Sequence, residues 1–184
     1  METSRLLPTL GLISVTAAWG STFFLIKDLV LQMPPLDFLG VRFALAALLI
    51  VIFQFKRLKE ASRREWSRGA ILGGIYSAAQ LFQTVGLQHT DASISGFITG
   101  MYVVFTPVLL ALLFHQHITG LAWAAVAIAT AGLAFLSLEG FAFGLGESLT
   151  LAGALLYAFH IVFLGRWARH SDPLTLGAIQ LVAA

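Results

Sequence analysis

Arg42 is the residue that most directly suggests chemistry, because it lies inside the apolar stretch PPLDFLGVRFALAALLIVIF at positions 34–53. A charge at the centre of a membrane-spanning helix costs ~2.5–3.5 kcal/mol on the insertion scale, so such an arginine needs a partner or a water-filled cavity. A guanidinium in a cavity would attract anionic or carboxylate-bearing ligands. The alternative is a structural role, in which Arg42 binds Glu147 or the backbone carbonyls freed near Pro107. The sequence leaves both roles open.

Other polar side chains recur at helical spacing inside apolar segments. Tyr76, Gln80 and Gln83 are separated by four and three positions, which places them on one helical face. We expect this face to point away from lipid, where it either lines a cavity that binds a solute or bonds a neighbouring helix. A second face of this kind, on the next apolar segment, contains Ser95, Thr99, Tyr102 and Thr106, followed by Pro107.

Aromatic residues and one histidine complete the set of candidates. Trp19 lies near the middle of the first apolar segment, whereas tryptophans of the aromatic belt lie at the membrane interfaces. It could shape a ligand cavity or pack in the core. His160 shares a helical face with Tyr157 and could relay protons or form a structural hydrogen bond. The candidate cavity residues are Trp19, Ser21, Thr22, Arg42, Tyr76, Gln80, Gln83, Thr99, Tyr102, Thr106, Tyr157 and His160.

The composition requires that membrane-spanning helices carry these side chains. The chain is 58% hydrophobic and only 11% charged, with a mean hydropathy of +0.87, which excludes an ordinary soluble domain of 184 residues. A helix needs ~20 apolar residues to cross the bilayer. The sequence therefore predicts an all-α, polytopic transmembrane helix bundle surrounded by the lipid bilayer. The predicted spans are 6–26, 36–55, 69–88, 93–114, 119–138 and 147–165, with a seventh beginning at Pro173.

The positions of the positive charges predict the orientation. A cytoplasmic N-terminus places all 11 Lys and Arg residues except Lys27 and Arg42 on the inner side. The basic stretch 56–68 is then expected to be a cytoplasmic loop that anchors two helix ends. Nucleic-acid binding is disfavoured, because the net charge is only +2 and the basic residues flank apolar runs.

An internal repeat divides the chain. The shift that superimposes Pro35 on Pro173 and Leu36 on Leu174 also pairs Arg42 with Gln180. The same shift places Trp19 over Tyr157. A repeat unit of five helices inserts its second copy upside down, which is a transporter architecture with its site near the midplane. Small residues spaced by four, namely Gly69, Gly73, Gly96, Gly100, Ala125 and Ala129, predict close helix packing.

Four motifs in order resemble a known family. They are AAWGSTFFLIK at 17–27, the Pro-x-x-Phe-x-x-x-Arg pattern that ends at Arg42, GLQHTDASISGFITGMYVVFTPVLLALLF at 86–114 and AGLAFLSL at 131–138. Together they resemble an EamA domain, the repeat unit of the drug/metabolite transporter superfamily of bacterial inner membranes. The resemblance covers residues 10–138 as one repeat and the opening of a second, which predicts units at 6–138 and 145–184. It implies ten helices in two inverted halves that move small organic metabolites or drugs by alternating access.

The resemblance also implies helices beyond the seventh, so we expect the chain to be a fragment of a longer protein. A homodimer could supply the remaining helices only if its protomers were inserted in opposite orientations, which the positive-inside bias disfavours. The alternatives in other functional classes are a non-transporting membrane scaffold and a membrane-embedded enzyme that depends on His160.

Two further motifs are interpreted as connections between helices. The His-Gln-His of 115–117 does not place both histidines on one helical face, so an interfacial turn is expected rather than a metal site. The Gly-Leu-Gly-Glu of 144–147 lacks the preceding strand and the Lys-Ser/Thr of a phosphate-binding loop. The sequence therefore predicts neither a cofactor nor ATP hydrolysis, and the absence of cysteine removes thiol chemistry.

Overall fold

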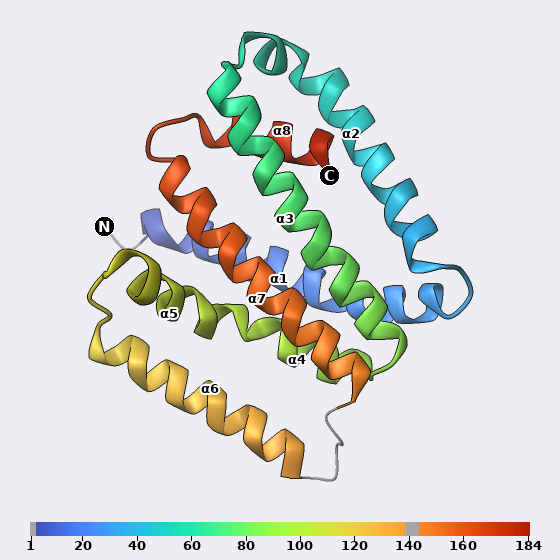
Figure 1. Ribbon diagram of the computed structural model, residues 1–184, viewed down its shortest axis with the longest axis vertical. Coiled ribbons are helices and arrows are strands. Elements are labelled where there is room, and N and C mark those ends of the chain that lie inside the picture. The colour runs from blue at the N-terminus through green and yellow to red at the C-terminus, as the bar shows by residue number, and fades with distance from the viewer. Residues whose placement is uncertain (1–2, 139–143) are drawn as a thin grey trace.

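The computed structural model describes residues 3–138 and 144–184, and these residues form a bundle of α-helices (Figure 1). The all-α prediction is confirmed. Five segments are long and apolar enough to cross a membrane, counting Ala92–Phe114 as one, and Gly120–Gly132 and Pro173–Ala183 are shorter apolar helices. The helices are α1 (Thr3–Val30), α2 (Pro35–Glu60), α3 (Arg63–Gln88), α4 (Ala92–Gly100), α5 (Tyr102–Phe114), α6 (Gly120–Leu138), α7 (Leu145–Trp167) and α8 (Pro173–Ala183).

The fourth predicted span, 93–114, is found as the membrane-capable segment Ala92–Phe114, but a break divides it into two helices. α4 ends at Gly100 and α5 begins at Tyr102, and the backbone N–H of Met101 between them donates to the carbonyls of Ile98 and Thr99. The bond to Ile98 closes the tighter turn of a 3₁₀ helix, which interrupts the regular α-helical ladder. Pro107 lies inside α5, downstream of this break. Tyr102 is thereby placed at the start of a new helix.

The basic stretch 56–68 is almost entirely helical, so its prediction as a loop was wrong. α2 continues to Glu60 and α3 begins at Arg63, which leaves a connection of two residues. A capping box explains the sharp restart: the Ser62 N–H donates to Glu65 Oε2 at 2.9 Å, and the Glu65 N–H donates to Ser62 Oγ at 3.3 Å. These reciprocal bonds satisfy backbone groups that the first helical turn leaves free.

α3 is the central helix of the described bundle. It packs most extensively against α7 and α8, while α2 packs on α8, α4 and α5 pack on α7, and α6 lies at the edge against α5 (Figure 1). In α1 and α2 only 6% of the most apolar window is buried within the structure, compared with 44% in α3. The peripheral helices therefore present their apolar faces to the surroundings of the chain, as expected of helices that contact lipid.

Close packing of α3 against α7 and α8 depends on glycines. A Cβ atom at Gly73 would lie 2.6 Å from the carbonyl oxygen of Gln180, and one at Gly86 would lie 2.8 Å from that of Gly146. The close helix packing predicted at Gly73 is thus found, whereas a Cβ atom at Gly100 would have no neighbouring atom within 4 Å. Glycine at these contacts allows the helix backbones to approach to distances that any side chain would prevent.

Asp172 caps α8 and supplies a test of pH dependence. Its Oδ2 accepts hydrogen bonds from the Thr175 N–H at 3.1 Å and the Thr175 hydroxyl at 2.8 Å, and lies 2.6 Å from Arg57 Nη1. The hydrogen bonds from Thr175 hold the pKa of the Asp172 carboxyl below its usual range, and Arg57 adds to this effect. The stability contributed by this carboxylate is therefore present above its unfolded-state pKa and is lost as the pH falls through its folded-state pKa.

We expect Asp172→Asn to lower the midpoint of thermal unfolding at neutral pH and to have no effect once the wild-type carboxyl is protonated. The measurement is the unfolding temperature of both proteins in detergent from about pH 7 to about pH 2, which extends below the usual range of carboxyl pKa values. Asp37→Asn, in the first turn of α2, is the matched control. A difference between wild type and Asp172→Asn that stays constant over this range would contradict the prediction.

Candidate functional site

A cavity of about 300 Å³ lies between α1, α3, α5 and α7. Aromatic rings from these four helices form most of its wall. The ring centroid of Trp19 lies 6.1 Å from that of Tyr102 and 6.4 Å from that of Tyr157, and Tyr76 lies 6.2 Å from Tyr157. The complete lining is Trp19, Tyr76, Gln80, Tyr102, Tyr157 and Ile161.

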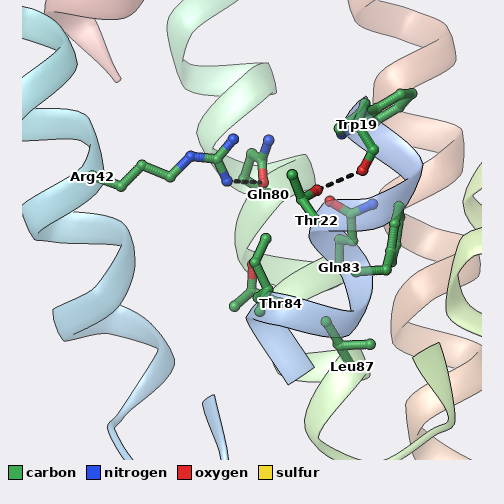
Figure 2. Close-up of a pocket in the computed structure, with 9 residues that line it drawn as sticks. Trp19, Thr22, Arg42, Gln80, Gln83, Thr84 and Leu87 are labelled. Atoms are coloured by element: carbon green, nitrogen blue, oxygen red, sulfur yellow. Dashed lines mark hydrogen bonds between the residues drawn. The ribbon is translucent and has the colours of Figure 1, made fainter. Parts of the chain in front are cut away.

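A second, narrow pocket adjoins this cavity and shares Trp19 and Gln80 with it (Figure 2). Its free volume is about 10 Å³, near the minimum that holds one water molecule. Figure 2 shows Arg42 reaching from α2 toward Gln80 on α3, with Trp19 and Thr22 on α1 beyond it. The lining residues are Trp19, Thr22, Phe23, Ile26, Arg42, Gln80, Gln83, Thr84 and Leu87.

Arg42 has a neutral partner. Its Nη1 donates to Gln80 Oε1 at 3.4 Å, and no carboxylate in the described part of the chain lies within ion-pair distance of it. The alternative in which Glu147 pairs with Arg42 is wrong, since Glu147 instead accepts from the Thr90 hydroxyl and from the Gly144 N–H at the start of α7. A carboxylate at that position satisfies the free N–H groups of its own helix.

The buried glutamines of α3 connect three helices through hydrogen bonds. The Tyr157 hydroxyl on α7 donates to Gln83 Oε1 at 2.9 Å, and Gln83 Nε2 donates to Thr99 Oγ1 on α4 at 3.0 Å. Gln80 Nε2 donates to the Tyr76 hydroxyl at 3.0 Å. Gln83 and Thr99 therefore bond to other helices, while Gln80 connects Arg42 to the aromatic wall.

The other predicted site residues lie outside the two pockets. Ser21 is exposed and donates to the carbonyl of Ala18 at 2.7 Å, and Thr106 donates to the carbonyl of Tyr102 at 2.7 Å. Such bonds to the preceding turn satisfy a hydroxyl within its own helix. His160 is buried behind Tyr76, with ring centroids 5.6 Å apart, and its Nε2 lies 2.8 Å from Gln180 Oε1.

Five residues of the lining, four of them apolar, were missed by the search for polar residues. A helical pattern of three- and four-residue steps that starts from Trp19, or from Gln80 and Gln83, would have identified most of it, because those residues share a face with the predicted ones. The missed residues are Phe23, Ile26, Thr84, Leu87 and Ile161.

A separate polar cluster joins the end of α1 to the turn after α3. Lys27 Nζ donates to the carbonyls of Leu87 at 2.8 Å, Gln88 at 3.2 Å and Thr90 at 2.9 Å. Backbone carbonyls at a helix C-terminus lack partners within the helix, and a cation there is favoured by the helix dipole. Lys27 therefore caps the C-terminus of α3.

The His-Gln-His stretch forms a turn, as predicted. His115 ends α5 in the left-handed region with φ 51°, and the residues up to Thr119 are not helical. Among the described residues, no group of three or more histidines and carboxylates is placed to hold a metal ion.

Comparison with known proteins identifies the family. The profile of the EamA-like transporter family matches residues 7–138. An uncharacterized transporter of Archaeoglobus fulgidus is 33% identical over 180 residues, which covers 97% of this chain and 56% of that protein. The uncharacterized inner membrane transporter YedA of Escherichia coli K12 is 30% identical over 190 residues, 100% of this chain and 61% of that protein. The uncharacterized transporter YvbV of Bacillus subtilis is 26% identical over 177 residues.

The chain thus spans between half and two thirds of the length of these relatives. No solved structure matches it. The family profile covers well over half of the chain, and its match coincides with the stretch that carries the helical cavity wall from Trp19 to Tyr102. This multi-pass membrane protein belongs to the EamA-like transporter family.

Proposed function

We propose that this protein is a secondary transporter that moves a small organic solute across the cell (inner) membrane by alternating access. The observation that carries the proposal is the cavity of about 300 Å³, which four helices long enough to span or enter the membrane line with aromatic and amide side chains. Ligand sites in helix bundles lie between helices and combine apolar walls with a few polar groups. Family membership favours transport over catalysis.

The break between α4 and α5 supports this role for the cavity. Tyr102, the first residue of α5, lines the cavity, and Met101 at the break is buried. Irregular backbone at membrane depth is tolerated where protein or a cavity covers it, and transporters place their sites at such discontinuous helices. We propose that a second inverted half, for which the greater length of the relatives leaves room, completes the walls of the site.

The charges support an orientation with the N-terminus in the cytoplasm. Two contacts join the basic stretch 56–68 to the connection between α7 and α8. Arg57 pairs with Asp172, and Arg68 Nη1 donates to Ser171 Oγ at 3.1 Å. Basic residues near helix ends favour the cytoplasmic side. The sequence has no phosphate-binding loop, so the proposed energy source is an ion gradient or the gradient of the solute itself.

Solute flux in proteoliposomes tests the proposal. The full-length protein is reconstituted into liposomes, which are incubated with a defined mixture of organic acids, amino acids, amines and nucleosides. After the liposomes are washed, the solutes retained inside them are analysed by mass spectrometry. We expect at least one solute to accumulate faster than in protein-free liposomes. Thr130→Val, at an exposed position of α6, serves as the variant control and should leave that flux unchanged.

A non-transporting scaffold is the second candidate, and one observation favours it. The bonds among Tyr157, Gln83 and Thr99 join three helices, as helix-packing contacts do. A folded, reconstituted protein that moves none of the solutes in the mixture would favour the scaffold.

A further inference from the structure

Resting on the proposed transport function, we propose that the solute is a small organic monocarboxylate with a flat unsaturated ring. The ring would occupy the aromatic cavity, and the carboxylate would lie at the end of the cavity that Gln80 lines, where it would bind the guanidinium of Arg42. Three features of the described residues carry this assignment: the arrangement of the rings, the unused donors of Arg42, and the absence of acidic side chains from the walls.

The rings form walls in different orientations. Trp19 meets Tyr157 at an interplanar angle of 84°, and Tyr102 meets Tyr157 at 65° with centroids 6.5 Å apart. Edge-on contacts of this kind leave ring faces free for a ligand, and flat rings prefer offset-stacked or edge-to-face contacts with them. A volume of about 300 Å³ is at the small end of ligand pockets, which suits a solute with a single ring system.

Arg42 retains most of its hydrogen-bonding capacity. A guanidinium has five N–H donors, and within the described part of the chain the only hydrogen bond of Arg42 is the long one to the neutral Gln80 side chain. The planar fork matches a carboxylate through two parallel bonds, and an intramembrane charge is stabilised when an opposite charge joins it. A carboxylate ligand would supply the counter-charge that the described protein does not.

The sign of the ligand charge follows from the walls. Aromatic rings also attract cations, so the rings alone would equally suit an amine. However, neither set of lining residues in the described chain contains Asp or Glu, and Arg42 lines the narrow pocket, which shares Trp19 and Gln80 with the cavity. A bound ammonium group would therefore face a like charge and have no carboxylate partner. The same argument disfavours a zwitterion relative to a simple carboxylate.

Tyr76 supplies a second donor near Arg42. Its hydroxyl oxygen accepts a hydrogen bond from Gln80 Nε2, and no acceptor in the described part of the chain takes its proton. Gln80 is buried and fixed between the two residues, because its Oε1 accepts from Arg42 while its Nε2 donates to Tyr76. The Tyr76 proton is thus free for a ligand oxygen.

Four related probes separate ring from charge in a binding experiment. Calorimetry with the full-length protein in lipid nanodiscs compares phenylacetate with phenylacetamide, which lacks the charge, cyclohexylacetate, which lacks the flat ring, and phenethylamine, which has the opposite charge. We expect phenylacetate to bind about tenfold or more tightly than phenylacetamide and phenethylamine, the usual effect of one charged hydrogen-bonded contact. Against cyclohexylacetate, which keeps the charge, we expect about two- to tenfold tighter binding, the usual effect of a contact between aromatic rings. Tightest binding of phenethylamine, or equal binding of phenylacetate and phenylacetamide, would overturn the inference.

Arg42→Gln then identifies the residue that recognises the charge. In this variant we expect the advantage of phenylacetate over phenylacetamide to vanish while phenylacetamide binds as it does to wild type; a persistent advantage would overturn the assignment.

If the variant does not fold, the four probes on the wild-type protein decide the solute class. If no probe binds although the flux assay finds another solute, the inference fails and the proposed function stands, whereas a lack of any flux defeats the proposed function itself.

Discussion

Gly86→Ala is expected to lower the thermal stability of the protein sharply, whereas Gly74→Ala on the same helix is expected to maintain or slightly raise it. A Cβ atom at Gly86 would lie 2.5 Å from Thr150 Oγ1 and 2.8 Å from the carbonyl oxygen of Gly146, so the backbones of α3 and α7 would have to separate. A Cβ atom at Gly74 would meet nothing within 4 Å. Overpacking of a tight contact costs ~1–3 kcal/mol, and alanine in place of an exposed helical glycine gains ~1 kcal/mol.

The measurement is the midpoint of thermal unfolding in detergent, followed by circular dichroism and by the yield of monodisperse protein. Gly146→Ala provides the reciprocal test, because its Cβ would lie 2.7 Å from the carbonyl carbon of His89 and 2.9 Å from the oxygen of Gly86. Since both substitutions separate the same pair of helices, the double variant should lower the unfolding midpoint by less than the sum of the two single effects. Equal midpoints for Gly86→Ala and Gly74→Ala would show that α3 and α7 do not meet at these glycines.

Arg42→Gln is expected to reduce the kcat/KM for flux of the transported solute by ~10–100-fold, as the loss of a charged hydrogen-bonded contact predicts. The folded protein should accumulate normally. Glutamine keeps polarity at this position, as Gln180 does at the matching position of the predicted repeat. Among the described residues, only the 3.4 Å hydrogen bond to Gln80 depends on the guanidinium. Flux in proteoliposomes and the elution profile of the purified variant are the two measurements.

Arg57→Gln is the matched control for the loss of a guanidinium. Arg57 forms an exposed ion pair with Asp172, and exposed pairs contribute little to stability. Its replacement should leave both flux and yield near those of the wild type. Arg42→Lys should retain part of the flux, because lysine keeps the charge but not the planar fork. If Arg42→Gln fails to accumulate as folded protein, Arg42 has a structural role, and the comparison of phenylacetate with phenylacetamide on the wild-type protein decides whether it also recognises the charge of the solute.

The sequence by itself determined the helices and the faces that carry the cavity. In a bilayer every backbone N–H and C=O must bond within its own segment, so apolar length alone predicts helices. Helical spacing placed Tyr76, Gln80 and Gln83 on one side of α3, where Tyr76 and Gln80 line the cavity and Gln83 lines the narrow pocket. These inferences succeed because they depend on rules that act within one helix or on a pattern of the sequence.

Predictions from hydropathy and charge failed where a helix cap or a single tight turn interrupts the helix. The two-residue connection at Ser62 and the break at Met101 depend on capping and on a single tight turn, which the hydropathy of a whole span does not register. The division into units at 6–138 and 145–184 stays a prediction. In the structure α7 and α8 pack directly on α3, so the two proposed units share one core.

The tertiary structure alone decided which residues meet across helices. Glu147 had the right charge for Arg42, yet it lies at the start of α7 and bonds to Thr90 and its own helix end. Ser21 and Thr106 have the right chemistry but bond to their own backbone, away from both pockets. The spacing of residues along one helix fixes their shared face, but the rotation and crossing of each helix depend on packing against its neighbours, such as the glycine contact of Gly86 with Gly146.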